Sequence, residues 1–590
     1  MFSVMKKPIR HPFIALFLTA SFITACSDKG NTEQQTKEKD TTHKAIEYVT
    51  TEIVKGSEFC GVHGLGVDAN DNLYAGSVVG ERVYKINIAT GKAETIVAPP
   101  KGNADDIEFL PDGTMVWTSI SQNAVRAKKP NGEVFDLAKD IVSVNSIAHN
   151  EKDKRLFVAQ VFGGDGLWEL DPDGEKPPRN IMKDMGGLNG FDIGPDGMIY
   201  GPLWFKKKIV KINPDTGEMQ TVVDGFHTPA AANFDSNWNL YVLDTATGEV
   251  FTVDIKTGDK KLFVTLKTSL DNLAIDSNDQ IYVSNMADNS IQKINPINKE
   301  ITTIIPGGLS CSLAINVFSE KELTKDTIYL SDVFALRIID GKSGEIKDIL
   351  RAHKADTPIE YPTYSTSNEN YLFVLGDGGL HQFRRKSLDK DKFELVKQWY
   401  GIVGIQAMTA LNDNRLLMLH DGGTSLTLSN PLPTSPLDVV SSSDKHDSQS
   451  YLENNPLNIG QLITDKLQGA TAISKVHHNK IYVVQRETQS IIEVDLISGE
   501  FREVINNLDQ PQGLDITPQG NIVVMTGSPG SVLLIDPITG EPKEIASGIN
   551  VGRLGKGANL KTSGISVSES GNIYVIADGD NSILRISPKP

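Results

Sequence analysis

Five residues that could bind a cation recur at one position of a repeated pattern, directly before a short apolar stretch. They are His63, Asp105, Asn145, Asn189 and Asp271. Carboxylate and amide oxygens favour a hard divalent cation, Ca²⁺ first, with Mg²⁺ or Mn²⁺ as alternatives, and an imidazole shifts the preference toward transition metals. Asn and Asp are also common at turns and strand starts, so each residue alone could be structural. Their repetition predicts a shared site.

Such a site could activate a carbonyl group and a water molecule. A bound cation polarises a carbonyl and stabilises the developing negative charge, while a nearby base removes a proton from water. His63 would be the general base, because its ordinary pKa is near neutrality. Asp271 would act beside it and hold the cation with Asn145, Asn189 and either Asp105 or Asp106.

The elements that must position these residues are short strands in a repeat of about 40 to 44 residues. Stretches such as "HGLGVDANDNLYAG", "NGFDIGPDGMIYGP" and "DNLAIDSNDQIYVSN" each give a strand, a turn and a second strand. This spacing, with turn residues between short apolar strands, is typical of four-stranded β-propeller blades. About twelve copies predict an all-β fold of two six-bladed propellers, whose innermost strands converge on an axis.

We expect the first propeller to span residues 46–308 and the second 309–590, with a loop insertion at about 430–459 that is rich in Pro, Ser and Asp. In blade five the aligned position holds Pro229, which cannot bind a cation. The aligned positions of the second half contain no carboxylate, which favours a structural or ligand-binding role there. A spare strand in "IEYVTTEIVKG" could complete a blade of either ring.

The N-terminus begins with three cationic residues and continues with an apolar run too short to span a bilayer. The run ends in "ITAC", which resembles the bacterial lipobox. This resemblance implies a signal peptide over 1–25, lipidation of Cys26, a polar tether over 26–45 and a lipid anchor in the cell envelope, in the outer membrane and facing the periplasm or the surface. The alternative is a secreted protein with an ordinary signal peptide.

Charge and cysteine content limit the partners and the redox chemistry. The net charge of -17 argues against a nucleic-acid surface, and no basic amphipathic helix for membrane binding is visible. Cys60 and Cys311 remain after lipidation. They are either a disulfide or two buried thiols, and closing the first ring at blade six would bring them together.

The first half resembles the six-bladed superfamily of gluconolactonase, senescence marker protein and paraoxonase, although single blades also match general NHL repeats. The resemblance rests on "LNGFDIGPDGMIY", "VNSIA", "LDNLAIDSNDQIYV", "VHGL" and "ADDIEFLPDG". It implies hydrolysis of a small lactone or ester at a Ca²⁺-type site of one Glu, two Asn and one Asp. Asn145, Asn189 and Asp271 match that set, whereas His63 stands in the Glu column.

Two other classes of function remain open. His227 precedes the blade-five strand, where streptogramin lyases place functional residues, so it could contact substrate together with Asn272. A propeller lyase would need His227 and a cation at one point. Alternatively, the protein could be a noncatalytic lipoprotein that binds a protein, a glycan or a small molecule, because propellers host many unrelated functions.

Overall fold

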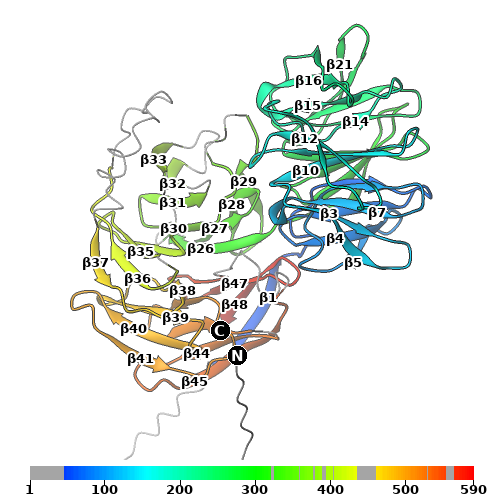
Figure 1. Cartoon of the computed structure of the whole chain (residues 1–590). Coiled ribbons are helices and arrows are strands. Elements are labelled where there is room, and N and C mark those ends of the chain that lie inside the picture. The colour runs from blue at the N-terminus through cyan, green and yellow to red at the C-terminus, as the bar shows by residue number, and fades with distance from the viewer. Residues whose placement is uncertain are drawn as a thin grey trace, which may run out of the picture. The chain divides into compact units, whose positions relative to one another are not determined.

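In a computed structural model, the described part of the chain folds into twelve four-stranded antiparallel sheets. Figure 1 shows their arrangement as blades. The structure describes residues 46–589 except 321–324, 356, 358, 377–378, 388–393, 401, 403, 421, 435–459, 528 and 553–563. Each sheet is one blade, which confirms the predicted all-β propeller architecture. Cys26, the expected signal peptide and tether, and residues 435–459 of the expected loop lie outside the described residues.

The first six blades contain only consecutive strands. Blades one to three are β2 (Leu65–Val67), β3 (Leu73–Ser77), β4 (Arg82–Asn87), β5 (Lys92–Val97); β6 (Ala104–Phe109), β7 (Met115–Ser119), β8 (Ala124–Lys128), β9 (Val134–Lys139); and β10 (Val144–Asn150), β11 (Arg155–Gln160), β12 (Gly166–Leu170), β13 (Arg179–Lys183). Blades four to six are β14 (Asp192–Ile193), β15 (Ile199–Leu203), β16 (Lys208–Ile212), β17 (Met219–Val223); β18 (Pro229–Phe234), β19 (Leu240–Asp244), β20 (Glu249–Val253), β21 (Lys260–Thr265); and β22 (Leu270–Ile275), β23 (Ile281–Asn285), β24 (Ser290–Ile294), β25 (Ile301–Ile305).

Blades seven to eleven also contain only consecutive strands, whereas blade twelve includes one strand from the N-terminal end of the chain. Blades seven to nine are β26 (Ser312–Glu320), β27 (Lys325–Asp332), β28 (Ala335–Asp340), β29 (Ile346–Arg351); β30 (Tyr364–Ser367), β31 (Tyr371–Gly376), β32 (Gly379–Arg384), β33 (Leu395–Tyr400); and β34 (Ala407–Ala410), β35 (Leu416–His420), β36 (Ser425–Leu428), β37 (Gln461–Thr464). Blades ten to twelve are β38 (Ala470–Ile473), β39 (Lys480–Gln485), β40 (Ser490–Asp495), β41 (Phe501–Ile505); β42 (Leu514–Ile516), β43 (Ile522–Met525), β44 (Gly530–Ile535), β45 (Pro542–Ile549); and β46 (Ile565–Val567), β47 (Ile573–Ala577), β48 (Ser582–Pro588), β1 (Tyr48–Val54).

Contacts between innermost strands close two separate rings. β2 contacts both β6 and β22, so blade one lies against blades two and six. β26 in turn contacts both β30 and β46, so blade seven lies against blades eight and twelve. The described chain also has three short 3-10 helices, η1 (Ile120–Gln122), η2 (Trp204–Lys206) and η3 (Arg385–Ser387), and no helix in it is long and apolar enough to cross a membrane.

The spare N-terminal strand completes the second ring. β1 pairs antiparallel with β48, with Tyr48 opposite Pro588, and forms the outer edge of blade twelve (Figure 1). The expected range 46–308 for the first propeller therefore needs a correction, because residues 48–54 belong to a sheet of the other ring. The sequence could not decide this point, since either ring offered an edge that β1 could cover.

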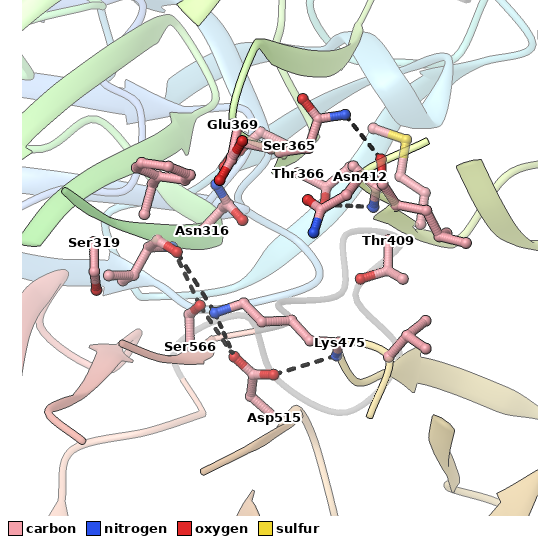
Figure 2. Close-up of a pocket in the computed structure, with 18 of the residues that line it drawn as sticks. Asn316, Ser319, Ser365, Thr366, Glu369, Thr409, Asn412, Lys475, Asp515 and Ser566 are labelled. Atoms are coloured by element: carbon pink, nitrogen blue, oxygen red, sulfur yellow. Dashed lines mark hydrogen bonds and ion pairs between the residues drawn. The ribbon is translucent and has the colours of Figure 1, made fainter. Parts of the chain in front are cut away.

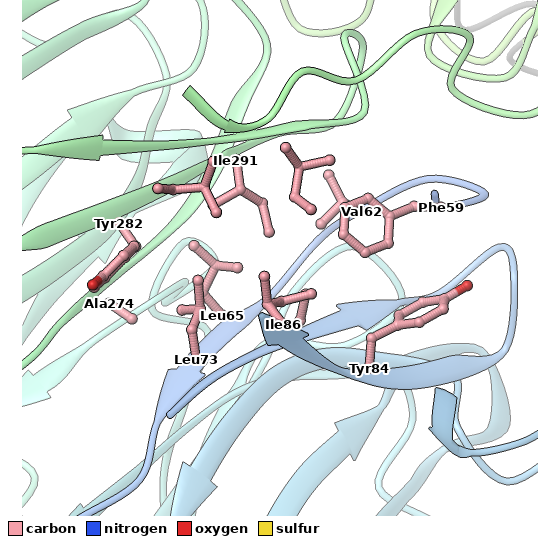
Figure 3. Packing of buried hydrophobic residues seen from close by; sticks show 12 residues of the cluster. Phe59, Val62, Leu65, Leu73, Tyr84, Ile86, Ala274, Tyr282 and Ile291 are labelled. Carbon is pink, nitrogen blue, oxygen red and sulfur yellow. The ribbon is translucent and has the colours of Figure 1, made fainter. Parts of the chain in front are cut away.

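Side chains from blades one and six pack together where the first ring closes (Figure 3). Leu65 and Leu73 from blade one meet Tyr282 and Ile291 from blade six in one buried cluster. Fully burying such side chains contributes about 1.5–3 kcal/mol each. The closure is therefore apolar, which leaves the polar residues free to gather at the axis.

The turn between the first two strands of a blade is stabilised by its own aspartate. In blade one, Asp68 accepts hydrogen bonds from the backbone amides of Asn70 and Asn72 and from the Tyr74 hydroxyl, all between 2.9 and 3.0 Å. The Asp196 and Asp276 turns repeat the pattern. This interaction explains why "IYV" follows the turn, and it needs no functional role for either residue.

Candidate functional site

The predicted ligands lie where the innermost strands are irregular. In β10 the register passes from Val144 to Ser146, which leaves Asn145 between the two pairs in a β-bulge. The register passes in the same way from Ala104 to Ile107 and from Leu270 to Leu273, around Asp105 and Asp271. A bulge leaves its extra residue unpaired and can turn that side chain in a new direction.

The register corrects some of the aligned positions. In β18 the pairing passes from Pro229 to Ala231, so Ala230 and not Pro229 matches Asn145. In the second ring the same comparison assigns Leu313, Thr363 and Thr471. In β18, β26 and β38 a bulge adds a residue that the repeat period does not reveal. The described positions of the second ring still hold no carboxylate.

We call His63, Asp105, Asn145, Asn189 and Asp271 the axial cluster, since they occupy matching positions in five blades of the first ring. The Ser146 hydroxyl donates to Oδ1 of Asn145 at 2.8 Å and lies 3.1 Å from Oδ1 of Asn189. Asn145 also hydrogen-bonds the Asp105 carboxylate. Polar contacts therefore connect blades two, three and four at the axis.

Asp105 and Asp271 are close enough for their charges to interact. Burial, together with repulsion from Asp271 and Asp106, raises the pKa of Asp105 well above its usual range. Burial and repulsion from Asp106 raise the pKa of Asp271 to about 7. Both side chains keep some exposure to solvent, whereas Asn145 and Asn189 are buried. Ionising both carboxylates without a counter-charge is therefore costly.

His63 is buried, although a general base needs contact with the water molecule that it activates. Its ring packs edge-on against Phe334 with centroids 5.0 Å apart, and Nδ1 donates to the Gly61 carbonyl at 3.1 Å. Burial lowers its pKa to about 4. The imidazole is thus neutral and a weak base, so the structure favours Asp271 over His63 for accepting a proton.

Asp106 and Asn272 stabilise the ring. The Asn272 amide donates to Oδ1 of Asp106 at 2.9 Å, and Oδ2 of Asp106 accepts the Ile147 amide at 3.1 Å. These bonds join blades two, three and six. Blade one comes so close to blade two that it needs a glycine at Gly64, where an added Cβ would lie 2.1 Å from the Asp105 carbonyl oxygen. We therefore take Asp105 as the available ligand, and Asn272 as a brace in place of the predicted substrate contact.

Two acidic residues that sequence reasoning missed lie three positions after the cluster. Glu108 accepts the His149 amide of the next blade, and Asp192 accepts the Phe234 amide of the next blade at 2.9 Å. Burial raises the pKa of Glu108 to about 8 and that of Asp192 to about 6. Extending the repeat alignment by three residues would have found them, because an acid recurs at this position. In the second ring Asp515 stands there and accepts the backbone amide of Val567 in the next blade.

His227 lies apart from this chemistry. Its side chain is exposed on the segment before β18, and its backbone amide donates to Asp244 at 2.6 Å. The described contacts give it no partner in the axial cluster. The lyase hypothesis needs His227 and a cation together, and the structure provides no contact that supports this pairing.

The donor chemistry fits a hard cation. The described residues contain no group of three or more His, Cys, Asp and Glu side chains arranged for a metal ion. A cation here would therefore be held by the Asp105 and Asp271 carboxylates with the amide oxygens of Asn145 and Asn189. Such an oxygen set suits Ca²⁺, Mg²⁺ or Mn²⁺ better than a transition metal.

The two remaining cysteines form a disulfide. Cys60 precedes blade one and Cys311 precedes blade seven, and their Cα atoms lie 4.6 Å apart. Both residues are buried beside Phe334 and Met286. The bond therefore links the entry into the first ring with the entry into the second.

The second ring contains a cavity of about 840 Å³ on its own axis (Figure 2). Innermost segments of all six blades line it, with Ser, Thr and Asn side chains prominent. Lys475 extends across the axis, where its ammonium group lies 3.3 Å from Asp515 and 2.5 Å from the Val567 carbonyl. The hydroxyl of Ser365 is buried without a partner. This volume is in the range of small-molecule sites.

Comparisons with known proteins find solved structures that resemble part of this chain. No family model matches the chain, and no curated protein matches it. A streptogramin B lyase structure aligns at 12% identity over 48% of this chain and 94% of its own, with a TM-score of 0.36. A gluconolactonase from Xanthomonas campestris aligns at 13% identity over 40% and 86%, with a TM-score of 0.35. A nidogen/laminin complex aligns at 15% identity over 43% and 93%, with a TM-score of 0.35.

Proposed function

We propose that the first propeller is a hydrolase of small lactones or esters that depends on a divalent cation, Ca²⁺ above others. The observation that carries this proposal is the partly exposed carboxylate pair, Asp105 and Asp271, whose pKa values are raised by burial and by neighbouring carboxylates. Such a pair requires positive charge to be fully ionised near neutral pH. Asn145 and Asn189 add neutral oxygens beside it.

The reaction follows from this arrangement. The cation, when bound, polarises the substrate carbonyl and water and balances the developing oxyanion. Asp271 accepts the proton of the attacking water as its oxygen bonds to the carbonyl carbon. When the bond from that carbon to the alcohol oxygen breaks, the same proton passes to the departing oxygen. Asp105 and Asn145 keep their positions because they stand in the bulges of β6 and β10, and Asn189 keeps its position because its backbone amide donates to the Pro202 carbonyl at 3.0 Å.

Calorimetric titration of chelator-treated protein with Ca²⁺ tests the proposal. We expect one site whose affinity falls at least about 100-fold in Asp105→Asn and in Asp271→Asn, because each variant removes half of the charge. Hydrolysis of γ-butyrolactone and phenyl acetate should be lost in parallel. Asp259→Asn, at an exposed position far along blade five, is the matched control. Full Ca²⁺ binding by both site variants would refute the proposal.

The cavity of the second ring favours a second function, binding of a neutral, hydroxyl-rich ligand such as a short glycan. Thr366, Thr409, Asn412 and the unpartnered Ser365 hydroxyl offer donors and acceptors around it. Thermal-shift titration with neutral trisaccharides should show stabilisation that Thr409→Val and Asn412→Ala reduce. If no trisaccharide in a broad panel shifts the melting temperature, this second function is wrong.

We further propose that Cys26 carries the lipid that anchors the protein in the bacterial envelope, at the outer membrane. The support is the lipobox-like "ITAC" after a short apolar run. Cys26→Ala should abolish fatty-acid labelling and release the protein from the membrane fraction. Labelling that persists in this variant would contradict the assignment.

A further inference from the structure

A segment of the second propeller packs against the first propeller beside the axial cluster. We call residues 351–355 and 359–361, between β29 and β30, the roof. Its backbone contacts blade six, where the Ser269 hydroxyl donates to the Ala352 carbonyl at 2.5 Å, and blade five, where the Ala355 amide donates to the Ala246 carbonyl at 3.3 Å. Ser269 stands two residues before Asp271, so the roof begins beside the cluster.

Aromatic rings extend the roof to two more blades. The His353 ring packs edge-on against Trp204 of blade four, with centroids 4.9 Å apart. Tyr361 packs against Phe334 at 5.6 Å, and Phe334 packs against His63 of blade one at 5.0 Å. Direct and relayed contacts therefore reach blades one, four, five and six around the axial cluster.

Arginine side chains anchor the start of the roof. Arg351 pairs with Asp288 of blade six at 2.7 Å and donates to the Thr268 carbonyl at 2.9 Å. Arg337, in β28, donates to the Ala287 carbonyl. Charge-assisted bonds of this kind are stronger than neutral ones, and Arg351 and Arg337 are both largely buried. The roof is thus fixed to the first ring at its base.

Two neighbours hold His353 in a single orientation. Its Nδ1 lies 3.3 Å from the Glu360 carboxylate, which also accepts the His353 backbone amide at 2.7 Å. Its Nε2 lies 2.8 Å from the Tyr361 hydroxyl. Both ring nitrogens therefore have a polar neighbour, a carboxylate beside Nδ1 and a hydroxyl hydrogen-bonded to Nε2. A ring held at both nitrogens is suited to a positioning role.

We propose that the second propeller completes the site of the first: His353, oriented by Glu360 and Tyr361, is a positioning residue that holds the roof over the axial cluster and limits the size of molecules that reach it. The part that concerns substrates rests on the proposed hydrolase, whereas the covering of the cluster does not. Ala230 has the register of a cluster residue, is 1% exposed and belongs to an apolar cluster against which Trp204 packs, and His353 in turn contacts Trp204.

Thiol labelling of Ala230→Cys in the full, disulfide-intact chain tests the cover without any activity. The native Cys60 and Cys311 are bonded to each other, and Cys26→Ala removes the remaining thiol. We expect His353→Ala to accelerate labelling by fluorescein maleimide at least about 10-fold, with a smaller gain for the compact reagent methyl methanethiosulfonate. His353→Gln should restore slow labelling in part. His478→Ala, an exposed histidine of blade ten, is the matched control.

The outcomes separate the two proposals. Equal labelling rates in the His353→Ala and control chains, for both reagents, would overturn the roof even if Ca²⁺ binds as expected. If Ca²⁺ binding fails but labelling accelerates, the roof stands and the hydrolase falls. If both hold, His353→Ala should lower KM for phenyl acetate several-fold more than for γ-butyrolactone, with little change in kcat. A uniform loss of kcat with both substrates would contradict a positioning role in size selection.

Discussion

Asp105 and Asp271 show how a fold can hold two acids near one axis. Their usual ladder partners are lost to bulges, so neither side chain contributes to the sheet itself. Their raised pKa values mean that the cation-free protein carries an electrostatic cost near neutral pH. The same cost becomes a source of affinity when a cation binds.

Asp271→Asn should therefore stabilise the cation-free protein. Removing one of two interacting carboxylates is expected to raise the free energy of unfolding at pH 8 by about 1–3 kcal/mol, a range reduced for the partial exposure of the group. Urea unfolding in the presence of a chelator measures this change. Saturating Ca²⁺ should reverse the order, with the unchanged protein more stable than the variant; a variant that is less stable under both conditions would contradict this prediction.

Glu108 and Asp192, three residues after Asp105 and Asn189, predict that the stability of the fold depends on pH. Glu108 and Asp192 have folded-state pKa values of about 8 and about 6, above their usual range because of burial. The folded state then binds more protons than the unfolded state between pH 4 and 8, so stability falls as pH rises through that window. Unfolding free energies at pH 5 and pH 8 measure the fall. Asp192→Asn should make the fall shallower, and an unchanged slope would argue against this source.

Residue-level features were predictable only where the repeat alone decides them. Asn145, Asn189 and Asp271 stand at matching positions in the sequence, and the register of the sheets keeps them matched. Ala230 was missed because the bulge in β18 shifts the register by one residue. The role of Asp106 depends on Asn272, 166 residues away, and the cover on His63 depends on Phe334. Neither contact leaves a local pattern.

At the scale of elements, β1 is a short strand with an uneven distribution of burial. Thr50, Thr51 and Glu52 are exposed, whereas Val54 is 6% exposed and packs with Leu309 and Ile583. The strand thus exposes Thr and Glu residues together with Val49 at the edge of blade twelve, and buries Val54, with Ile53 packed beside it, where the second ring closes. Its attachment depends on backbone pairing along its length and on Val54.

Val54→Asp should open this closure. A charge buried without a partner is expected to cost about 3 kcal/mol or more, while Thr51→Asp at the exposed face should cost less than about 0.5 kcal/mol. Limited proteolysis should then cut the Val54→Asp chain within or next to β1 first. Equal resistance of the two variants would show that β1 does not depend on this contact.

At the scale of the whole chain, the first propeller is an insertion in the second. β1 belongs to blade twelve, the next strands β2 to β25 build the first ring, and β26 resumes the second. The chain passes between the rings twice, near Cys60 and near Cys311, and the disulfide joins these two crossings. The repeat predicted twelve blades and two rings, but not this nesting, because pairing of the two chain ends is independent of the repeat period.

Removing the disulfide should weaken the molecule at these crossings. Cys60→Ala with Cys311→Ala is expected to lower the free energy of unfolding by about 2–5 kcal/mol. Reductant should lower the melting temperature of the unchanged protein and leave that of the double variant unaltered. Calorimetry with and without reductant measures both effects. If reductant shifts both proteins equally, the loss arises elsewhere.

The pairing of β1 with β48 also sets the order in which the rings can close as the chain emerges from its N-terminus. The first ring has all its strands once β25 emerges, while β1 must wait for the roughly 280 residues that follow it. At typical synthesis rates that interval is about 15–60 s, during which β1 is an unpaired strand edge. The exposed Thr and Glu residues of β1 are what such a waiting strand needs to avoid pairing with a neighbouring nascent chain.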